Sequence, residues 1–152
     1  YNRMGYQKLS ISYFTIMREK KMPVLVMFID LDRLKYINDT FGHEYGDFAI
    51  VSIAKAMLKH CDADAIAART GGDEFIVLEG AKDEESGRVL AQKIRTELSK
   101  TQRAMQLPFD LSASIGAVVA HPGEENVLES YVKRAEMLMY EEKAEKKVSR
   151  DS

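Results

Sequence analysis

The segment Gly71-Gly72-Asp73-Glu74-Phe75 places two adjacent carboxylates beside two glycines, between two apolar stretches. Like charges side by side repel each other, so this pair of acids needs a positive partner. Glycines allow the backbone to approach a phosphate closely. The combination predicts a hairpin tip where a cation neutralises the two acids. Alternatively, Asp73 and Glu74 could be ordinary turn residues.

A second acidic cluster lies upstream, where Asp30 ends an apolar run and Asp32 follows it. A helix is predicted to begin at Arg33, and the free N–H groups at a helix start attract phosphate. Mg²⁺ takes one or two protein carboxylates and fills its other positions with water and phosphates. If the two acidic segments pack together, Asp30 and Asp73 face the same ion. Asp32 could instead cap the helix.

Four other residues have both a functional and a structural interpretation. Asp47 could be an acid in the first turn of the helix that follows it, and Asn38 could end a helix. Lys143 and Lys147 lie one turn apart near a helix C-terminus, where cations are favoured in any case. His43 lacks partners at ligand spacing, so we do not assign it to a metal.

Periodicity predicts the elements that must position these residues. The run VLVMFI indicates a buried strand, and Gly71-Gly72 between two β-rich stretches indicates a hairpin. Predicted helices cover residues 5–20, 33–41, 48–60, 83–103 and 125–147, and predicted strands cover 24–29, 65–70, 74–79 and 109–120. A hairpin within alternating helices and strands favours an α+β fold with a mostly antiparallel sheet.

Composition narrows the class of protein. The 152 residues fit one domain, with 45% apolar and 30% charged residues. A net charge of −2 without a block of like charge argues against nucleic-acid or membrane binding. Cys61 is the single cysteine, which excludes an internal disulfide and suits the cytoplasm. The sequence begins at Tyr1 without methionine, so we expect a piece of a longer protein, which other segments could anchor to a membrane.

Five motifs in order resemble the GGDEF domain of the diguanylate cyclase family. The signature GGDEF is present at residues 71–75 and is preceded by Arg69. The segment DLDRLKYINDTFGHEYGD at residues 30–47 is similar to the family pattern D-x-D-x-x-K-x-I-N-D-x-x-G-H-x-x-G-D. Three further family motifs have similar counterparts here, which are SIG at residues 114–116, AEMLMYEEK at residues 135–143 and YNRMGY at residues 1–6. The last of these matches only the end of its motif. The resemblance covers essentially the whole chain.

The resemblance implies a fold and an activity. The fold is a five-stranded, mostly antiparallel sheet flanked by helices, similar to nucleotide cyclases and polymerase palms. The activity joins two GTP molecules into cyclic di-GMP and releases two pyrophosphates. It uses Mg²⁺ or Mn²⁺, usually two ions, and a homodimer, because each domain holds one GTP. The alternative is a catalytically silent GTP-binding module that regulates a neighbouring domain. Such modules usually lose signature acids, and this chain retains them.

The resemblance also implies roles for single residues. Asp30, Asp73 and the Leu31 carbonyl would ligate metal. Asp73 is also the candidate base for the attacking 3′-hydroxyl, and Glu74 would support the site. Phosphates would be bound by the backbone amides of Arg33, Leu34 and Lys35 and by the side chains of Lys143 and Lys147. Guanine would be bound by Asn38 and Asp47. Gly72 would also contact the substrate.

The chain departs from the family pattern at a few positions. Lys147 stands where arginine is usual, Leu34 replaces a frequent phenylalanine, and KAEKK at residues 143–147 lacks its usual glycine. Many relatives bind product at an R-x-x-D motif before the signature, but Asp62 and Ala65 occupy those positions here. We therefore predict no inhibitory product site on this surface.

Overall fold

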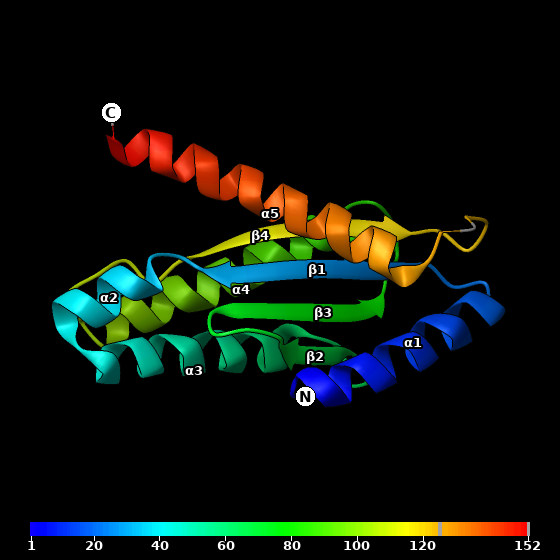
Figure 1. Ribbon diagram of the computed structural model, residues 1–152, viewed down its shortest axis with the longest axis horizontal. Coiled ribbons are helices and arrows are strands. Elements are labelled where there is room, and N and C mark those ends of the chain that lie inside the picture. The colour runs from blue at the N-terminus through cyan, green and yellow to red at the C-terminus, as the bar shows by residue number, and fades with distance from the viewer. Residues whose placement is uncertain (125, 152) are drawn as a thin grey trace.

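The computed structural model describes residues 1–124 and 126–151. Its helices and strands follow the predicted order (Figure 1). The helices are α1 (Arg3–Glu19), α2 (Leu34–Phe41), α3 (His43–His60), α4 (Ser86–Ala104) and α5 (Leu128–Asp151). The strands are β1 (Val24–Leu31), β2 (Ile66–Arg69), β3 (Glu74–Gly80) and β4 (Ala113–Ala120).

The strands form an antiparallel sheet in the order β2-β3-β1-β4, so the α+β prediction is confirmed. Within the described residues the sheet has four strands. The four strands predicted from periodicity are all present, and the fifth, implied only by the family resemblance, is not. Only residues 105–112 connect α4 to β4, and this short link contains Pro108, which cannot donate to a central ladder.

Both faces of the sheet are covered, and β1 is buried along its whole length. Leu25, Met27 and Ile29 pack into the core formed with α2, α3 and α4. Val26 and Phe28 point to the opposite face and pack with α1 and α5. Alternate residues of a strand face opposite sides, so a strand buried on both faces needs a continuous apolar run. That requirement explains the unbroken apolar run VLVMFI at residues 24–29.

A glycine brings α5 against the sheet. A Cβ atom on Gly116 of β4 would lie 2.0 Å from the Ala135 carbonyl oxygen and 2.5 Å from the Met139 backbone nitrogen. Only glycine allows this approach, which accounts for the last residue of the SIG motif. The contact sets the path of α5 across β1 and β4, toward the start of α2 (Figure 1).

Several predicted boundaries were wrong. Gly42, at φ 101°, separates α2 from α3, and α3 then begins at His43 instead of residue 48. Phe109 and Leu111 are buried in the core outside the ladder, so β4 is shorter than residues 109–120. α5 begins at Leu128, and the predicted start, residue 125, lies outside the described residues. It continues past residue 147, because no glycine ends it there.

No helix in the described part of the chain combines the length and apolar character that crossing a membrane requires.

Candidate active site

Three carboxylates meet where β1 approaches α2. Asp30 lies at the end of β1 opposite Glu74, the first residue of β3, and Asp73 lies just before it. Each of the three offers an oxygen atom within 4.8 Å of the others. The Leu31 N–H donates a hydrogen bond of 2.9 Å to the Asp73 carbonyl, which ties the hairpin tip to β1. The structure thus brings Asp30 and Asp73 together, as the sequence predicted.

The tip of the hairpin is held by Arg69, which the sequence analysis noted only for its place two residues before Gly71. Its guanidinium donates to the Gly71 carbonyl at 3.1 Å and to the Gly72 carbonyl at 2.7 and 3.1 Å. Gly72 is exposed, and a Cβ atom there would contact nothing within 4 Å. The backbone of the tip is therefore fixed from one side and open to an approaching group on the other.

The acids crowd one another electrostatically. Burial raises the pKa of Asp30 to about 7; the Lys143 ammonium opposes the rise and Asp73 adds to it. Burial also raises the pKa of Glu74, and Asp73 and Glu136 add to that effect. One oxygen of Asp30 is buried without a hydrogen-bond partner among the described residues. This oxygen makes an ion pair of 3.3 Å with the Lys143 ammonium, and crowded carboxylates of this kind also fit a divalent cation.

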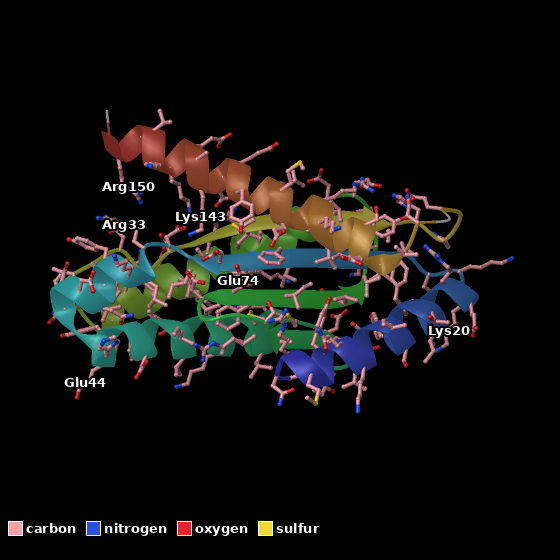
Figure 2. All side chains as sticks on the ribbon, viewed as in Figure 1. Lys20, Arg33, Glu44, Glu74, Lys143 and Arg150 are labelled. Carbon is pink, nitrogen blue, oxygen red and sulfur yellow. The ribbon has the colours of Figure 1, made fainter. Side chains whose placement is uncertain are left out.

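Lys143 approaches the same oxygens from α5. Its ammonium nitrogen lies 3.3 Å from an Asp30 oxygen and 3.4 Å from the Leu31 carbonyl oxygen. Lys143 and Glu74 lie at the same end of the sheet, next to the start of α2 (Figure 2). Lys147, one turn further along α5, is exposed. The structure therefore brings Lys143 to the acidic cluster and leaves Lys147 outside it.

Asp32 does not cap α2, so that interpretation was wrong. The helix N-cap is Arg33, and no side chain caps it. The buried Asp32 carboxylate accepts hydrogen bonds of 2.7 Å from each of Ser112, Ser114 and Lys146. Burial opposes its ionisation, but these hydrogen bonds outweigh burial and hold the pKa of Asp32 below its usual range. Sequence reasoning missed Lys146, whose only signal was that it interrupts the family pattern.

The turn into α2 has an unusual backbone. Arg33 adopts a left-handed conformation, with φ 59° and ψ 38°, and its guanidinium lies 3.9 Å from the centre of the Tyr36 ring. α2 starts one residue later than predicted. The first N–H groups of a helix have no partner within it, so the amides of Leu34 and Lys35 are candidates for an anion. They lie at the edge of the acidic cluster.

Asn38 packs across the α2–α3 corner against Gly46, the residue before Asp47. A Cβ atom on Gly46 would lie 1.8 Å from the Asn38 side-chain oxygen, so Gly46 makes room for that amide against α3. The oxygen is buried and lacks a hydrogen-bond partner within the described residues. Asp47 is exposed and lies beyond the first turn of α3, whose acid is Glu44. The first-turn interpretation of Asp47 was therefore wrong.

Comparison with known proteins identifies the family. The family description "Diguanylate cyclase, GGDEF domain" matches residues 1–149. This chain belongs to that family. Diguanylate cyclase VdcA of Vibrio cholerae is 33% identical over 147 residues, which cover 94% of this chain and 42% of the relative. The probable diguanylate cyclase DgcT of Escherichia coli is 36% identical over 127 residues, covering 82% of this chain and 28% of the relative.

Solved GGDEF domains have the same fold. The active GGEEF domain of a diguanylate cyclase from Vibrio cholerae superposes with a TM-score of 0.78 at 25% identity, covering 92% of this chain and 88% of that one. A microbial GGDEF domain described in an interaction with cyclic di-GMP gives a TM-score of 0.77 at 28% identity, covering 95% and 88%. The chain spans less than half the length of the curated relatives VdcA and DgcT.

Asp73→Ala should abolish the cyclic di-GMP synthesis that we propose below for this chain, and it should leave the fold intact. The side chain lies at a hairpin tip outside the core, so its removal costs little packing, and it relieves repulsion with Asp30 and Glu74. We expect a metal-free melting temperature at or above that of the unchanged protein. Product chromatography and thermal unfolding in a chelator measure the two effects. Near-normal turnover would contradict the assignment of Asp73 to the metal site.

The stability of the metal-free protein should fall as pH rises. The pKa of Asp30 is raised from 3.8 to about 7, so between these values the folded state binds more protons than the unfolded state. The contribution of Asp30 to the unfolding free energy therefore decreases from about pH 4 to about pH 7. Asp30→Asn removes this titration, and we expect it to stabilise the protein more at about pH 8 than at about pH 5. Denaturant unfolding in a chelator tests this, and an effect independent of pH would refute it.

Proposed function

We propose that this chain is a diguanylate cyclase domain that condenses two GTP molecules into cyclic di-GMP. The observation that carries the proposal is the convergence of Asp30, Asp73 and Glu74 beside Lys143 at the start of α2. Carboxylates for a metal, a lysine and free helix amides are what a nucleoside triphosphate needs at its phosphates. Membership of the family supports cyclic di-GMP synthesis as the reaction.

The reaction joins the 3′-hydroxyl of one GTP to the α-phosphate of another, and pyrophosphate leaves. Asp30, Asp73 and the Leu31 carbonyl would hold Mg²⁺ or Mn²⁺, and two ions fit the family. When bound, such metal neutralises charge on the phosphates and makes the hydroxyl a better nucleophile. Asp73 would accept the hydroxyl proton, and Glu74 would support the metal and the nucleotide. The protein otherwise contributes position and electrostatics.

The triphosphate would lie between α2 and α5. The amides of Arg33, Leu34 and Lys35 point outward from the start of α2 and would bind phosphate oxygens. Gly72 leaves the hairpin tip open to the nucleotide. Lys143 contacts its present partners at 3.3 Å or more, so it is free to move toward a phosphate. The exposed Lys147 would bind the outer phosphates through its charge.

Guanine would lie at the α2–α3 corner. Its Watson–Crick edge presents two neighbouring N–H donors, and one carboxylate such as Asp47 can accept both. The Asn38 side chain lies at the same corner, where its oxygen is buried without a hydrogen-bond partner in the described residues, and a small rearrangement would let it contact the base. Adenine lacks that pair of donors, so acceptors placed here favour GTP.

The cyclic product requires two domains, because each would hold one GTP. We therefore propose that the active form is a homodimer with the two sites facing each other. The alternative is a silent GTP-binding module. A relative named cyclic di-GMP phosphodiesterase PdeR, 30% identical over 115 residues, keeps this alternative open. The intact signature acids favour the cyclase.

Incubation with GTP and Mg²⁺, followed by chromatography, tests the proposal. We expect cyclic di-GMP and pyrophosphate, with a rate per domain that rises with protein concentration because the active form is a dimer. Bound GTP without product at high protein concentration would instead identify the silent module.

Asp47→Ala should weaken GTP binding and relax base choice. A site that depends on hydrogen bonds can discriminate by about 10⁴, so losing this acceptor should remove most preference for GTP over ATP. An exposed substitution of this kind changes stability by only about 0.5 kcal/mol. Calorimetry with both nucleotides measures the change. Unchanged GTP affinity would return Asp47 to a purely structural role.

Cyclic di-GMP should inhibit only by competition at the active site. The exposed Asp62 lies near Asp64 and the buried Glu79. Burial raises the pKa of Glu79, a hydrogen bond from the Asp62 N–H opposes the rise, and the charges of Asp62 and Asp64 add to it. An anionic product meets repulsion there. Initial rates with added product measure the effect, and strong non-competitive inhibition would contradict it. Asp62→Arg combined with Ala65→Asp restores the R-x-x-D pattern and should introduce such inhibition.

A further inference from the structure

Lys146 stands within KAEKK, the segment that lacks the usual glycine of the family. Because no glycine ends the helix, α5 continues through this position. The Lys146 ammonium lies 2.7 Å from an Asp32 oxygen, 2.8 Å from the Ala113 carbonyl oxygen and 3.2 Å from a Glu142 oxygen. The Lys146 side chain thus reaches the junction of β1, β4 and α2.

The residue it reaches is buried and leads directly into the turn before α2. The Asp32 side chain is 7% exposed. Its backbone N–H donates to the Ser112 carbonyl at 2.9 Å, and Arg33 follows in the left-handed conformation. A non-glycine residue in that conformation costs about 1 kcal/mol or more, so the surrounding contacts must hold it. The Lys146–Asp32 contact, at 2.7 Å, is the shorter of the two ion pairs that Asp32 makes within the described residues.

The Lys146–Asp32 pair is also restrained by α4, through Glu142 of α5. Glu142, one turn before Lys146, accepts hydrogen bonds of 2.6 and 2.8 Å from Arg95 of α4. A series of ion pairs therefore connects α4, α5 and the end of β1. This chain of contacts restricts both the lysine and the turn that it holds.

The lysine is closely held, because it donates hydrogen bonds to Asp32 and to the Ala113 carbonyl and also forms an ion pair with Glu142. A lysine ammonium carries three protons, and three acceptors lie within 3.2 Å of it. Lys143, by contrast, meets its acceptors only at 3.3, 3.4 and 3.6 Å. The two lysines therefore have different roles, because Lys143 can leave its partners for a phosphate and Lys146 is committed to Asp32.

We propose that Lys146 is a positioning residue, which acts through Asp32 to hold the turn at Arg33 so that the first amides of α2 point at phosphate. Its effect on the nucleotide rests on the proposed function, but the restraint on the turn does not. Removing one partner of a buried ion pair leaves an uncompensated charge. In Lys146→Met, Asp32 should therefore shift and the turn should loosen.

The first test is hydrogen exchange without nucleotide. Lys146→Met should exchange the amides of residues 32–37 faster than the unchanged protein, and Lys146→Arg should largely restore protection. Lys133→Met is the matched control, because Lys133 lies on the same helix in an exposed pair with Glu129. Unchanged exchange in Lys146→Met would overturn the proposal, whatever the protein catalyses.

The second test is a double-mutant cycle on nucleotide affinity. It uses calorimetry with Mg²⁺ and a GTP analogue whose α–β bridging oxygen is a methylene. Lys146→Met and Asp32→Asn should each weaken binding about tenfold, about 1.4 kcal/mol, and the double variant should bind no worse than either. A full Lys146→Met effect in the Asp32→Asn background would mean direct contact with the nucleotide and would overturn the proposal. Unchanged affinity in Lys146→Met with a lowered melting temperature would overturn it too, as a role in stability alone.

The two tests separate the two proposals. If the unchanged protein binds no nucleotide, the proposed function fails, while faster exchange in Lys146→Met still supports the restraint. If it binds the analogue and makes cyclic di-GMP, but Lys146→Met changes neither exchange nor affinity, the restraint fails and the proposed function stands.

Discussion

Repulsion among carboxylates at one end of β1 is the constraint on which this structure depends. Asp30, Asp73 and Glu74 offer oxygen atoms within 4.8 Å of one another, and burial removes the water that would screen Asp30. Such a cluster is stable only if the surrounding chain is rigid enough to prevent the acids from moving apart. The antiparallel register between β1 and β3 and the hydrogen bonds of Arg69 at the hairpin tip supply that rigidity.

The compensating charge comes from α5, and its delivery depends on packing far from the acids. Gly116 allows α5 to lie directly on β4. From that contact the helix crosses the sheet so that Lys143 and Lys146 lie over the ends of β1 and β4. If α5 packed less closely at Gly116, Lys143 and Lys146 would therefore move relative to the carboxylates that they neutralise.

Periodicity predicted the fold well because β1 and the hairpin have strong signals. A strand buried on both faces needs an unbroken apolar run, and Gly71-Gly72 mark the turn. The meeting of Asp30 and Asp73 followed from the same pairing. Two boundaries were wrong where a single position decides them. α3 begins directly after Gly42 instead of at residue 48, and the absence of a glycine extends α5. The partners of Asp32 could not be predicted, because Ser112, Ser114 and Lys146 are distant in sequence and meet only after folding.

Lys143 and Lys146 lie on the same helix, but their surroundings differ, so the same residue type has two different roles. Lys143 lies among loosely arranged acceptors, and its ammonium competes for oxygens that would also hold a metal. Lys146 meets its acceptors at shorter distances, and its carboxylate partner is held by two serines as well. A loosely held lysine beside an anchored one suits the nucleotide binding that we propose, because the substrate would be highly charged. The anchored charge keeps Asp32 satisfied when Lys143 moves, so the turn into α2 need not rearrange when a nucleotide binds.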